Sequence, residues 1–119
     1  MLLLGLGTLF SMAEKTKTML EERGLSVSLV NPRFIKPLDT TVIERLAKQA
    51  KVVCTFEDHV LHNGFGCGVI ELLSDARITV PVERIGWPDE FVEHGKPDIL
   101  MKLHGLTAEA AFEKIVRHF

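Results

Sequence analysis

The chain of 119 residues carries 14 Lys and Arg against 16 Asp and Glu, a formal net charge of −2 at pH 7. This length suits a single domain with its own core, and the weak net charge with dispersed basic residues argues against a nucleic-acid or membrane-surface partner. Cys54 and Cys67 lack the spacing of a disulfide framework or a zinc site, and no apolar run approaches a membrane span, so we expect a cytoplasmic protein with reduced thiols.

The first predicted elements are a buried strand and a helix. Leu2–Leu6 is a short, almost continuously apolar run, which is typical of a strand covered on both faces. Ser11 and Glu14 have the spacing of a capping box and predict that a helix starts at Ser11. We expect this helix to run to Arg23 and to stop at Gly24, because glycine readily adopts the left-handed conformation that follows many helices.

A second strand and helix follow, separated by a proline-rich connector. Val27–Val30 predicts the strand, and Pro32 and Pro37 favour an extended connection after it. Asp39 is a favourable N-cap for the next helix. The apolar positions of that helix recur at helical spacing, and they are Val42, Ile43, Leu46, Ala47 and Ala50.

The second half of the chain continues the alternation. Val52–Phe56 and Val82–Ile85 predict the third and fourth strands. Between them, a helix is expected to turn four side chains inward: Val69, Ile70, Leu72 and Leu73. Pro97 begins a short helix that ends at Gly105, and Thr107 caps a last helix. The apolar face of this last helix comprises Ala108, Ala111, Phe112, Ile115 and Val116.

Strands and helices alternate along the whole chain, the strands are almost continuously apolar, and no hairpin turn is indicated. Parallel strands joined by right-handed crossover helices have this pattern. The sequence therefore predicts an α/β fold: one three-layer α/β/α domain, residues 1–119, with a mainly parallel sheet.

The stretch EDHVLHNGFG, residues 57–66, concentrates ionisable side chains at the exit of the third predicted strand. Glu57, Asp58, His59 and His62 include an H-x-x-H pair, which can bind a metal when both histidines share one helix face. Here the pair spans the end of a strand, where no common helix face is expected. We therefore interpret the stretch as a hydrogen-bonded loop rather than a metal site.

Gly64, Gly66 and Gly68 form a G-x-G-x-G run that resembles a phosphate-binding turn. The dinucleotide fingerprint requires G-x-G-x-x-G directly after the strand, so close packing of a helix on a strand is the plainer interpretation. The loop nevertheless lies at the carboxyl edge of a parallel sheet, where ligands bind. An anion held between residues 7–8 and 59–66 by the helix N-terminus at Gly66 stays an alternative.

Two further residues are weak candidates for chemistry. Cys67 near a helix N-terminus, with His59, could form a nucleophilic pair, because such a terminus lowers the pKa of a thiol. No third orienting group is apparent, so a packed small residue is the plainer interpretation. His94, in E-H-G, is a lone histidine before a turn glycine and by itself indicates no catalytic role.

Five phrases of the chain, taken in order, resemble one family. They are LLGLGT, VNPRFIKPLD, CTFEDHVLHNGFGCGV, RIGWPDEFVEHG and LHGLTAEAAFEKI. Over essentially its whole length the chain resembles the C-terminal domain of the 1-deoxy-D-xylulose-5-phosphate synthase family, transketolase-like enzymes that use thiamine diphosphate. The most specific motifs are R-F-x-K-P-L-D and G-x-P-D-x-F-x-x-H-G. Asn63, in place of the first glycine of the usual G-G-F-G, and His62 depart from the family pattern, which weakens any role of His62 in family chemistry.

The resemblance implies a parent enzyme that joins pyruvate to glyceraldehyde 3-phosphate with loss of CO2, for isoprenoid, thiamine and pyridoxal synthesis. Its thiamine diphosphate is held through Mg²⁺ by a G-D-G…N motif in the upstream domains. This chain has no G-D-G and only two asparagines, Asn31 and Asn63. We therefore expect it to be inactive alone and to hold no cofactor, metal or catalytic residue.

The alternatives are the C-terminal domain of another transketolase or of a 2-oxo acid dehydrogenase, and a small anion-binding regulatory domain. A plant member of the family would lie in the plastid stroma rather than in the cytoplasm.

The family fold has a five-stranded mixed sheet, whose antiparallel edge strand precedes the strand at Leu2–Leu6. We expect that strand to be missing from a fragment of a longer chain, which leaves Val27–Val30 as an exposed edge. The resemblance also implies contacts with the upstream domains of the same polypeptide and a homodimer. The residues expected to fix loop geometry and these contacts are Arg33, Lys36, Asp39, Glu57, His59, Gly64, Gly66 and His94.

Overall fold

The computed structural model describes residues 1–119. Its elements, in chain order, are β1 Leu2–Gly5, the 3-10 helix η1 Gly7–Leu9, α1 Phe10–Glu22, β2 Ser28–Val30, α2 Thr40–Ala47, β3 Val53–Val60, α3 Phe65–Asp75, β4 Val82–Trp87, α4 Pro97–Leu103 and α5 Ala108–Val116.

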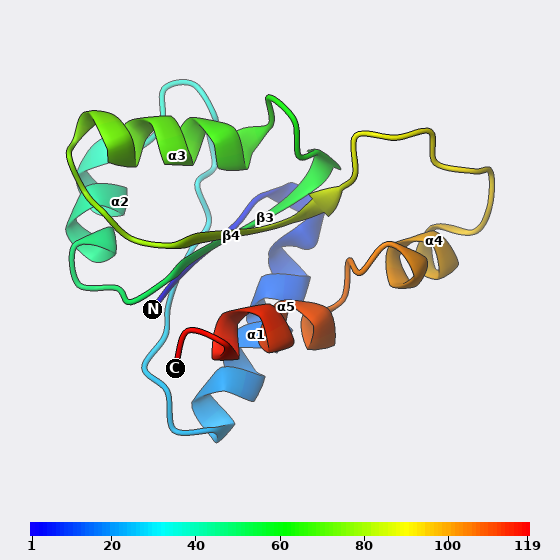
Figure 1. The fold of residues 1–119 in the computed structure, drawn as a ribbon, viewed down its shortest axis with the longest axis horizontal. Helices are drawn as coiled ribbons and strands as arrows, with labels where there is room; N and C mark the ends of the chain where they lie inside the picture. Colours follow the sequence, from blue (N-terminus) through cyan, green and yellow to red (C-terminus); the bar gives the residue numbers. More distant parts are fainter.

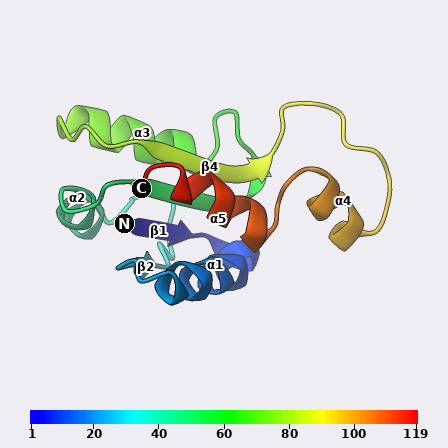
Figure 2. The ribbon, with the colours of Figure 1, turned by 60° about the horizontal axis from the view of Figure 1, so that its bottom comes forward.

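The four strands form one parallel sheet in the order β2-β1-β3-β4. Leu3 of the inner strand β1 lies opposite Leu29 of β2 on one side and opposite Cys54 of β3 on the other. Figures 1 and 2 show α1 and α5 on one face of the sheet and α2 and α3 on the other. This arrangement confirms the predicted three-layer α/β/α fold, with β2 at an edge of the sheet.

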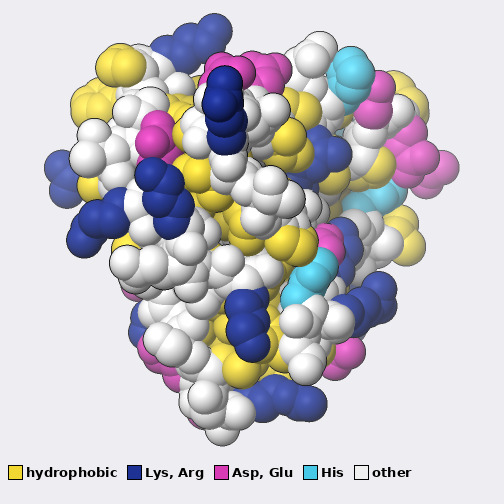
Figure 3. Space-filling model, turned by 60° about the vertical axis from the view of Figure 1, so that its left-hand side comes forward, with side chains coloured by type: hydrophobic (Ala, Val, Ile, Leu, Met, Phe, Trp, Pro, Cys, Tyr) yellow, Lys and Arg dark blue, Asp and Glu magenta, His cyan; other side chains and the backbone are white.

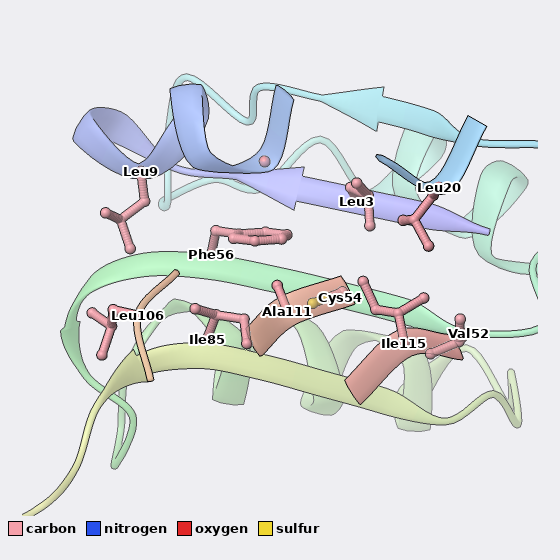
Figure 4. Close-up of a cluster of buried hydrophobic side chains, with 11 residues drawn as sticks. Leu3, Leu9, Leu20, Val52, Cys54, Phe56, Ile85, Leu106, Ala111 and Ile115 are labelled. Atoms are coloured by element: carbon pink, nitrogen blue, oxygen red, sulfur yellow. The ribbon is translucent and has the colours of Figure 1, made fainter. Parts of the chain in front are cut away.

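Each face of the sheet has its own apolar core, because successive side chains of a strand point to opposite faces. Leu3 belongs to the cluster drawn in Figure 4, whereas Leu2 and Leu4 belong to the cluster on the α2 and α3 side. The cluster in Figure 4 comprises Leu3, Leu9, Ala13, Leu20, Val52, Cys54, Phe56, Ile85, Leu106, Ala111 and Ile115. Burial on both faces explains why the strands are almost continuously apolar in sequence.

The helix ends follow the local signals in the sequence. The Asp39 carboxylate accepts a hydrogen bond from the Val42 amide at 3.2 Å, and Thr107 Oγ1 accepts one from the Ala110 amide at 3.1 Å. After α1, Gly24 has φ = +82°, the left-handed conformation in which glycine ends a helix without strain. These predicted caps are confirmed.

The predicted start of α1 is wrong. The helix begins at Phe10, its N-cap is Leu9, and no side chain caps it. Ser11 therefore lies within the first turn and forms no capping box with Glu14. The physical reason is the 3-10 turn at Gly7–Leu9, which leads directly into the α-helix and replaces a side-chain cap.

Two strands are longer than predicted. β3 continues past Phe56 to Val60, and β4 continues past Ile85 to Trp87. The pairing resumes at Val60 opposite Trp87 after an irregularity in register, so the ends of the two strands stay together. Glu57, Asp58 and His59 consequently belong to a strand and not to a loop.

The predicted inward orientation of Ile70 is also wrong. Ile70 is 40% exposed, whereas Phe65, Val69 and Leu73 of the same helix are buried. These three residues are spaced by four and form the single stripe that α3 turns toward the sheet. Ile70 lies off this stripe and faces solvent.

The charged side chains are spread over the surface. On the face shown in Figure 3, Lys and Arg are separated by apolar, acidic and other atoms and form no continuous basic area. None of the helices combines the length and the apolar character needed to cross a membrane.

Candidate functional site

The carboxyl ends of β1 and β3 border an open pocket of about 810 Å³. After β1 the chain forms β2 on one side of β1 and then β3 on the other side of β1. Ligands of parallel sheets bind where the strand order reverses in this way. The pocket lining includes Gly7, Thr8, Lys36, Asp58, His59 and Gly64. The predicted crevice between residues 7–8 and 59–66 is therefore present.

Glu57 is the acidic side chain that the fold buries completely, at 0% exposure. Its Oε2 accepts a hydrogen bond from the Gly66 amide at 2.9 Å, and its Oε1 has no hydrogen-bond partner. Burial raises the pKa of the Glu57 carboxyl above its ordinary value of 4.5, against the opposing effects of the Gly66 amide and the charge of His59. Glu57 thus holds the beginning of α3 against the end of β3.

Three glycines make room for Glu57 and its neighbour Thr55. A Cβ atom built on Gly64 would lie 2.6 Å from Glu57 Oε1, and one on Gly66 would lie 2.7 Å from Thr55 Oγ1. A Cβ atom on Gly86 of β4 would lie 3.1 Å from Glu57 Cγ. These distances are too short for any larger residue without movement, so the glycines serve close packing of α3 and β4 on β3. The predicted close packing thus holds for Gly64 and Gly66, whereas a Cβ atom on Gly68 would meet only Leu38 Cδ1, at 3.9 Å.

Cys67 and His59, which the sequence offered as a nucleophilic pair, form hydrogen bonds with different backbone carbonyls. The Cys67 thiol donates to the Leu61 carbonyl at 3.2 Å, and the Arg84 guanidinium donates to both Cys67 Sγ and that carbonyl. His59 Nδ1 lies 2.7 Å from the Val60 carbonyl oxygen, which requires that nitrogen to carry the proton. Arg84 thus braces the turn after β3.

Asp58 links three segments at the carboxyl edge. It accepts a hydrogen bond from Thr8 Oγ1 at 3.1 Å and another from Trp87 Nε1 at 2.7 Å. No group of three or more His, Cys, Asp or Glu side chains, including Asp58, His59 and His62, is placed to hold a metal ion.

The remaining predicted residues lie in exposed segments. Lys36, His59 and Gly64 line the pocket together, whereas Arg33 and Asp39 line a smaller hollow beside β2. His94 is exposed between β4 and α4 and lines neither.

Sequence reasoning did not find Thr55, Arg84, Gly86 and Trp87, which contact the predicted residues from within strands. The alternation of side chains along β3 could have placed Thr55 and Glu57 on the same face as Val53, under α3.

The pocket does not favour an anion. The Gly66 amide, which an anion at the start of α3 would need, already donates to Glu57. The acidic side chains of Asp58 and Glu71 also line the pocket, beside a single lysine, Lys36, and His59. An anion in the pocket would therefore lie near two carboxylates, which repel it, and one ammonium group, which attracts it.

Comparison with known proteins agrees with this architecture. Residues 1–110 match the family model described as the transketolase C-terminal domain. The chain is 46% identical over 113 residues to the 1-deoxy-D-xylulose-5-phosphate synthase of Acidobacterium capsulatum, which covers 95% of this chain and 18% of that protein. It is 43% identical over 119 residues to the synthase of the same name from Gloeothece citriformis, covering 100% of this chain and 19% of that protein.

A solved structure described as a split gene transketolase, inactive beta4 tetramer, superposes with a TM-score of 0.89 at 28% identity. The match covers 98% of this chain and 38% of that one. In the two synthases the matched segment is 18% and 19% of the protein, so the chain spans about a fifth of the length of these curated relatives. It belongs to the transketolase C-terminal domain family.

Proposed function

We propose that this chain is the C-terminal domain of a thiamine-diphosphate-dependent 1-deoxy-D-xylulose-5-phosphate synthase, and that it supports domain packing and the dimer without taking part in the chemical step. The observation that carries this proposal is identity of 43–46% to two synthases of that name over 95–100% of the chain. The likeness to a transketolase structure is weaker, at 28% identity, which favours a synthase over another transketolase.

The hydrogen-bonded groups at the carboxyl edge do not fit thiamine diphosphate and Mg²⁺. Binding a magnesium diphosphate requires free oxygen ligands and donors that reach phosphate oxygens. At the carboxyl edge, both oxygens of Asp58 already accept hydrogen bonds, and the Gly66 amide donates to Glu57. On this proposal the cofactor and the reaction of pyruvate with glyceraldehyde 3-phosphate belong to the other four-fifths of the parent enzyme.

The partners in this proposal are the upstream domains of the same polypeptide and a second copy of the parent enzyme. The proposed location is the cytoplasm, and both cysteines are free, as expected for thiols in a reducing compartment. Burial raises the pKa of the Cys54 thiol, so that thiol stays protonated and is a core residue rather than a nucleophile.

The first test is calorimetric titration of the 119-residue protein with thiamine diphosphate and Mg²⁺, followed by an assay for synthase turnover. We expect neither saturable binding nor turnover. Binding with turnover would contradict a non-catalytic role.

The second test uses a hybrid synthase, defined as the Acidobacterium capsulatum relative with its matching 113-residue segment replaced by this chain. We expect the hybrid to turn over pyruvate and glyceraldehyde 3-phosphate, and the relative without that segment to lose turnover. A folded hybrid without activity would count against the proposed parent reaction.

A further inference from the structure

The segment between β4 and α5 exposes large apolar side chains. In residues 88–104, here called the α4 arm, Phe91 is 92% exposed, Ile99 64% and Leu103 74%. Figures 1 and 2 both show α4 at the far end of the molecule, away from the sheet and the other helices. Single exposed apolar residues are ordinary, whereas several large ones that gather in one short segment are typical of an interaction site.

The fold itself does not use these side chains. Met101 packs the arm against the core cluster of α1 and α5, next to Leu106 just beyond the arm, and Leu100 packs near Gly95. Ile99 and Leu103 are four residues apart, so they share a face of α4, and no residue of α4 is buried. The arm therefore packs against the domain through one side, and on its other side the apolar side chains of Ile99 and Leu103 are exposed.

The charged residues of the arm are mainly acidic. The arm carries four carboxylates, Asp89, Glu90, Glu93 and Asp98, against two lysines, Lys96 and Lys102. Interfaces combine an apolar centre with a polar rim, and their potentials are complementary. A partner surface for the arm would therefore be an apolar groove with basic residues at its edge.

We propose that the α4 arm docks through Phe91, Ile99 and Leu103 into such a groove on the remaining part of the synthase polypeptide. This inference rests on the proposed function and names the surface through which the domain would pack. The relatives are about five times longer than this chain, which covers 18% of one and 19% of another, so a tethered partner is available.

The size of the patch favours a tethered partner over a second copy. A stable complex between free subunits buries about 800 Å² on each partner, more than three side chains provide. Contacts between domains of one polypeptide are held at high effective concentration by the linker, so a small apolar anchor suffices for them.

Hydrogen exchange measured by mass spectrometry tests the docking directly. We expect amides 98–104 to exchange about tenfold or more slowly in the hybrid synthase than in the isolated 119-residue chain, since docking suppresses local opening of a helix with no buried residue. The double substitution Ile99→Asp and Leu103→Asp removes this protection in the hybrid. The matched control Ile70→Asp, at an exposed apolar position of α3, leaves it in place.

One further measurement and one substitute for the hybrid complete the test. The melting temperature of the isolated chain should not change in the double variant, because both side chains are exposed there. Should this hybrid be insoluble, the same replacement made in the Gloeothece citriformis relative, whose match covers 100% of this chain, provides the exchange comparison in a tethered form.

The outcomes separate the two proposals. Equal exchange of amides 98–104 in an active hybrid and in the isolated chain would overturn the docking and leave the proposed function standing. A dimer of the isolated chain in sedimentation, lost in the Leu103→Asp variant, would overturn it in favour of a second copy. A folded, inactive hybrid counts against the proposed function instead.

Discussion

Glu57 combines complete burial with one unpartnered oxygen. Its Oε2 holds the first turn of α3 through the Gly66 amide, while Oε1 has no donor. Burying a carboxylate costs free energy unless its oxygens are satisfied, and a protonated carboxyl lowers that cost. The charged groups that act on it are His59 of β3 and Arg84 of β4, and neither offsets the effect of burial, which raises its pKa.

The first prediction concerns the pH dependence of stability. The pKa of Glu57 is higher in the folded state than its ordinary value of 4.5, so the folded state binds this proton more tightly. The stabilisation is fully present below about pH 4.5 and is lost as pH rises through the folded-state pKa. In urea unfolding between pH 5 and pH 8, the free energy of unfolding should therefore fall more steeply for the parent chain than for Glu57→Gln.

The control for this prediction is Glu71→Gln, at an exposed position of α3, which should retain the steep slope of the parent. Parallel profiles for the parent and Glu57→Gln would show that the carboxyl is ionised in both states.

The second prediction compares two glycines of α3. A Cβ atom on Gly66 would lie 2.7 Å from Thr55 Oγ1 and 2.8 Å from Arg84 Cδ, whereas the nearest atom to one on Gly68 is Leu38 Cδ1 at 3.9 Å. Gly66→Ala should lower the free energy of unfolding by about 1–3 kcal/mol through overpacking. Gly68→Ala should raise it by up to about 1 kcal/mol through helix propensity. Chemical denaturation measures both, and equal effects would contradict the packing role of Gly66.

The site could be predicted only in part. The glycine run indicated close packing, and the carboxyl edge indicated a crevice. The contacts that organise the edge come from residues distant in sequence: Arg84 reaches the turn after β3, and Trp87 reaches Asp58. No local pattern connects an arginine in one strand with a carbonyl 23 residues earlier.

At the scale of single elements, local signals predicted helix ends well and strand ends poorly. The caps at Asp39 and Thr107 depend on a side chain and an amide three residues apart, so the sequence contains all of their determinants. The polar end of β3 is extended by its pairing with β4, which the sequence of β3 does not reveal. Ser11 met the pattern of a capping box, but a 3-10 turn had already begun the helix.

The third prediction concerns the cap of α2. Asp39→Ala removes the acceptor for the Val42 amide at 3.2 Å and should cost about 1 kcal/mol of stability. Asp39→Asn keeps a capping oxygen without the charge and should stay close to the parent. Thermal unfolding distinguishes the pair, and an equal loss in both variants would assign the effect to the charge of Asp39 instead of to its hydrogen bond.

At the scale of the whole molecule, the four-stranded parallel sheet with two apolar cores forms a three-layer unit, and Asp58 accepts hydrogen bonds from Thr8 and Trp87 at the carboxyl edge of the sheet. The large apolar side chains with the highest exposed fractions lie outside the layers. They belong to the α4 arm and to the connector that carries Phe34, which is 70% exposed. This distribution suits a domain that packs against other domains, as proposed above.

Turnover of the hybrid synthase tests the central claim most directly. The measurement compares formation of 1-deoxy-D-xylulose 5-phosphate by the hybrid with that by the Acidobacterium capsulatum relative lacking the matching segment, and with that by the isolated chain. We predict activity in the hybrid and none in the other two. A folded hybrid without activity, or activity in the isolated chain, would contradict the assignment of this chain as a non-catalytic C-terminal domain of such a synthase.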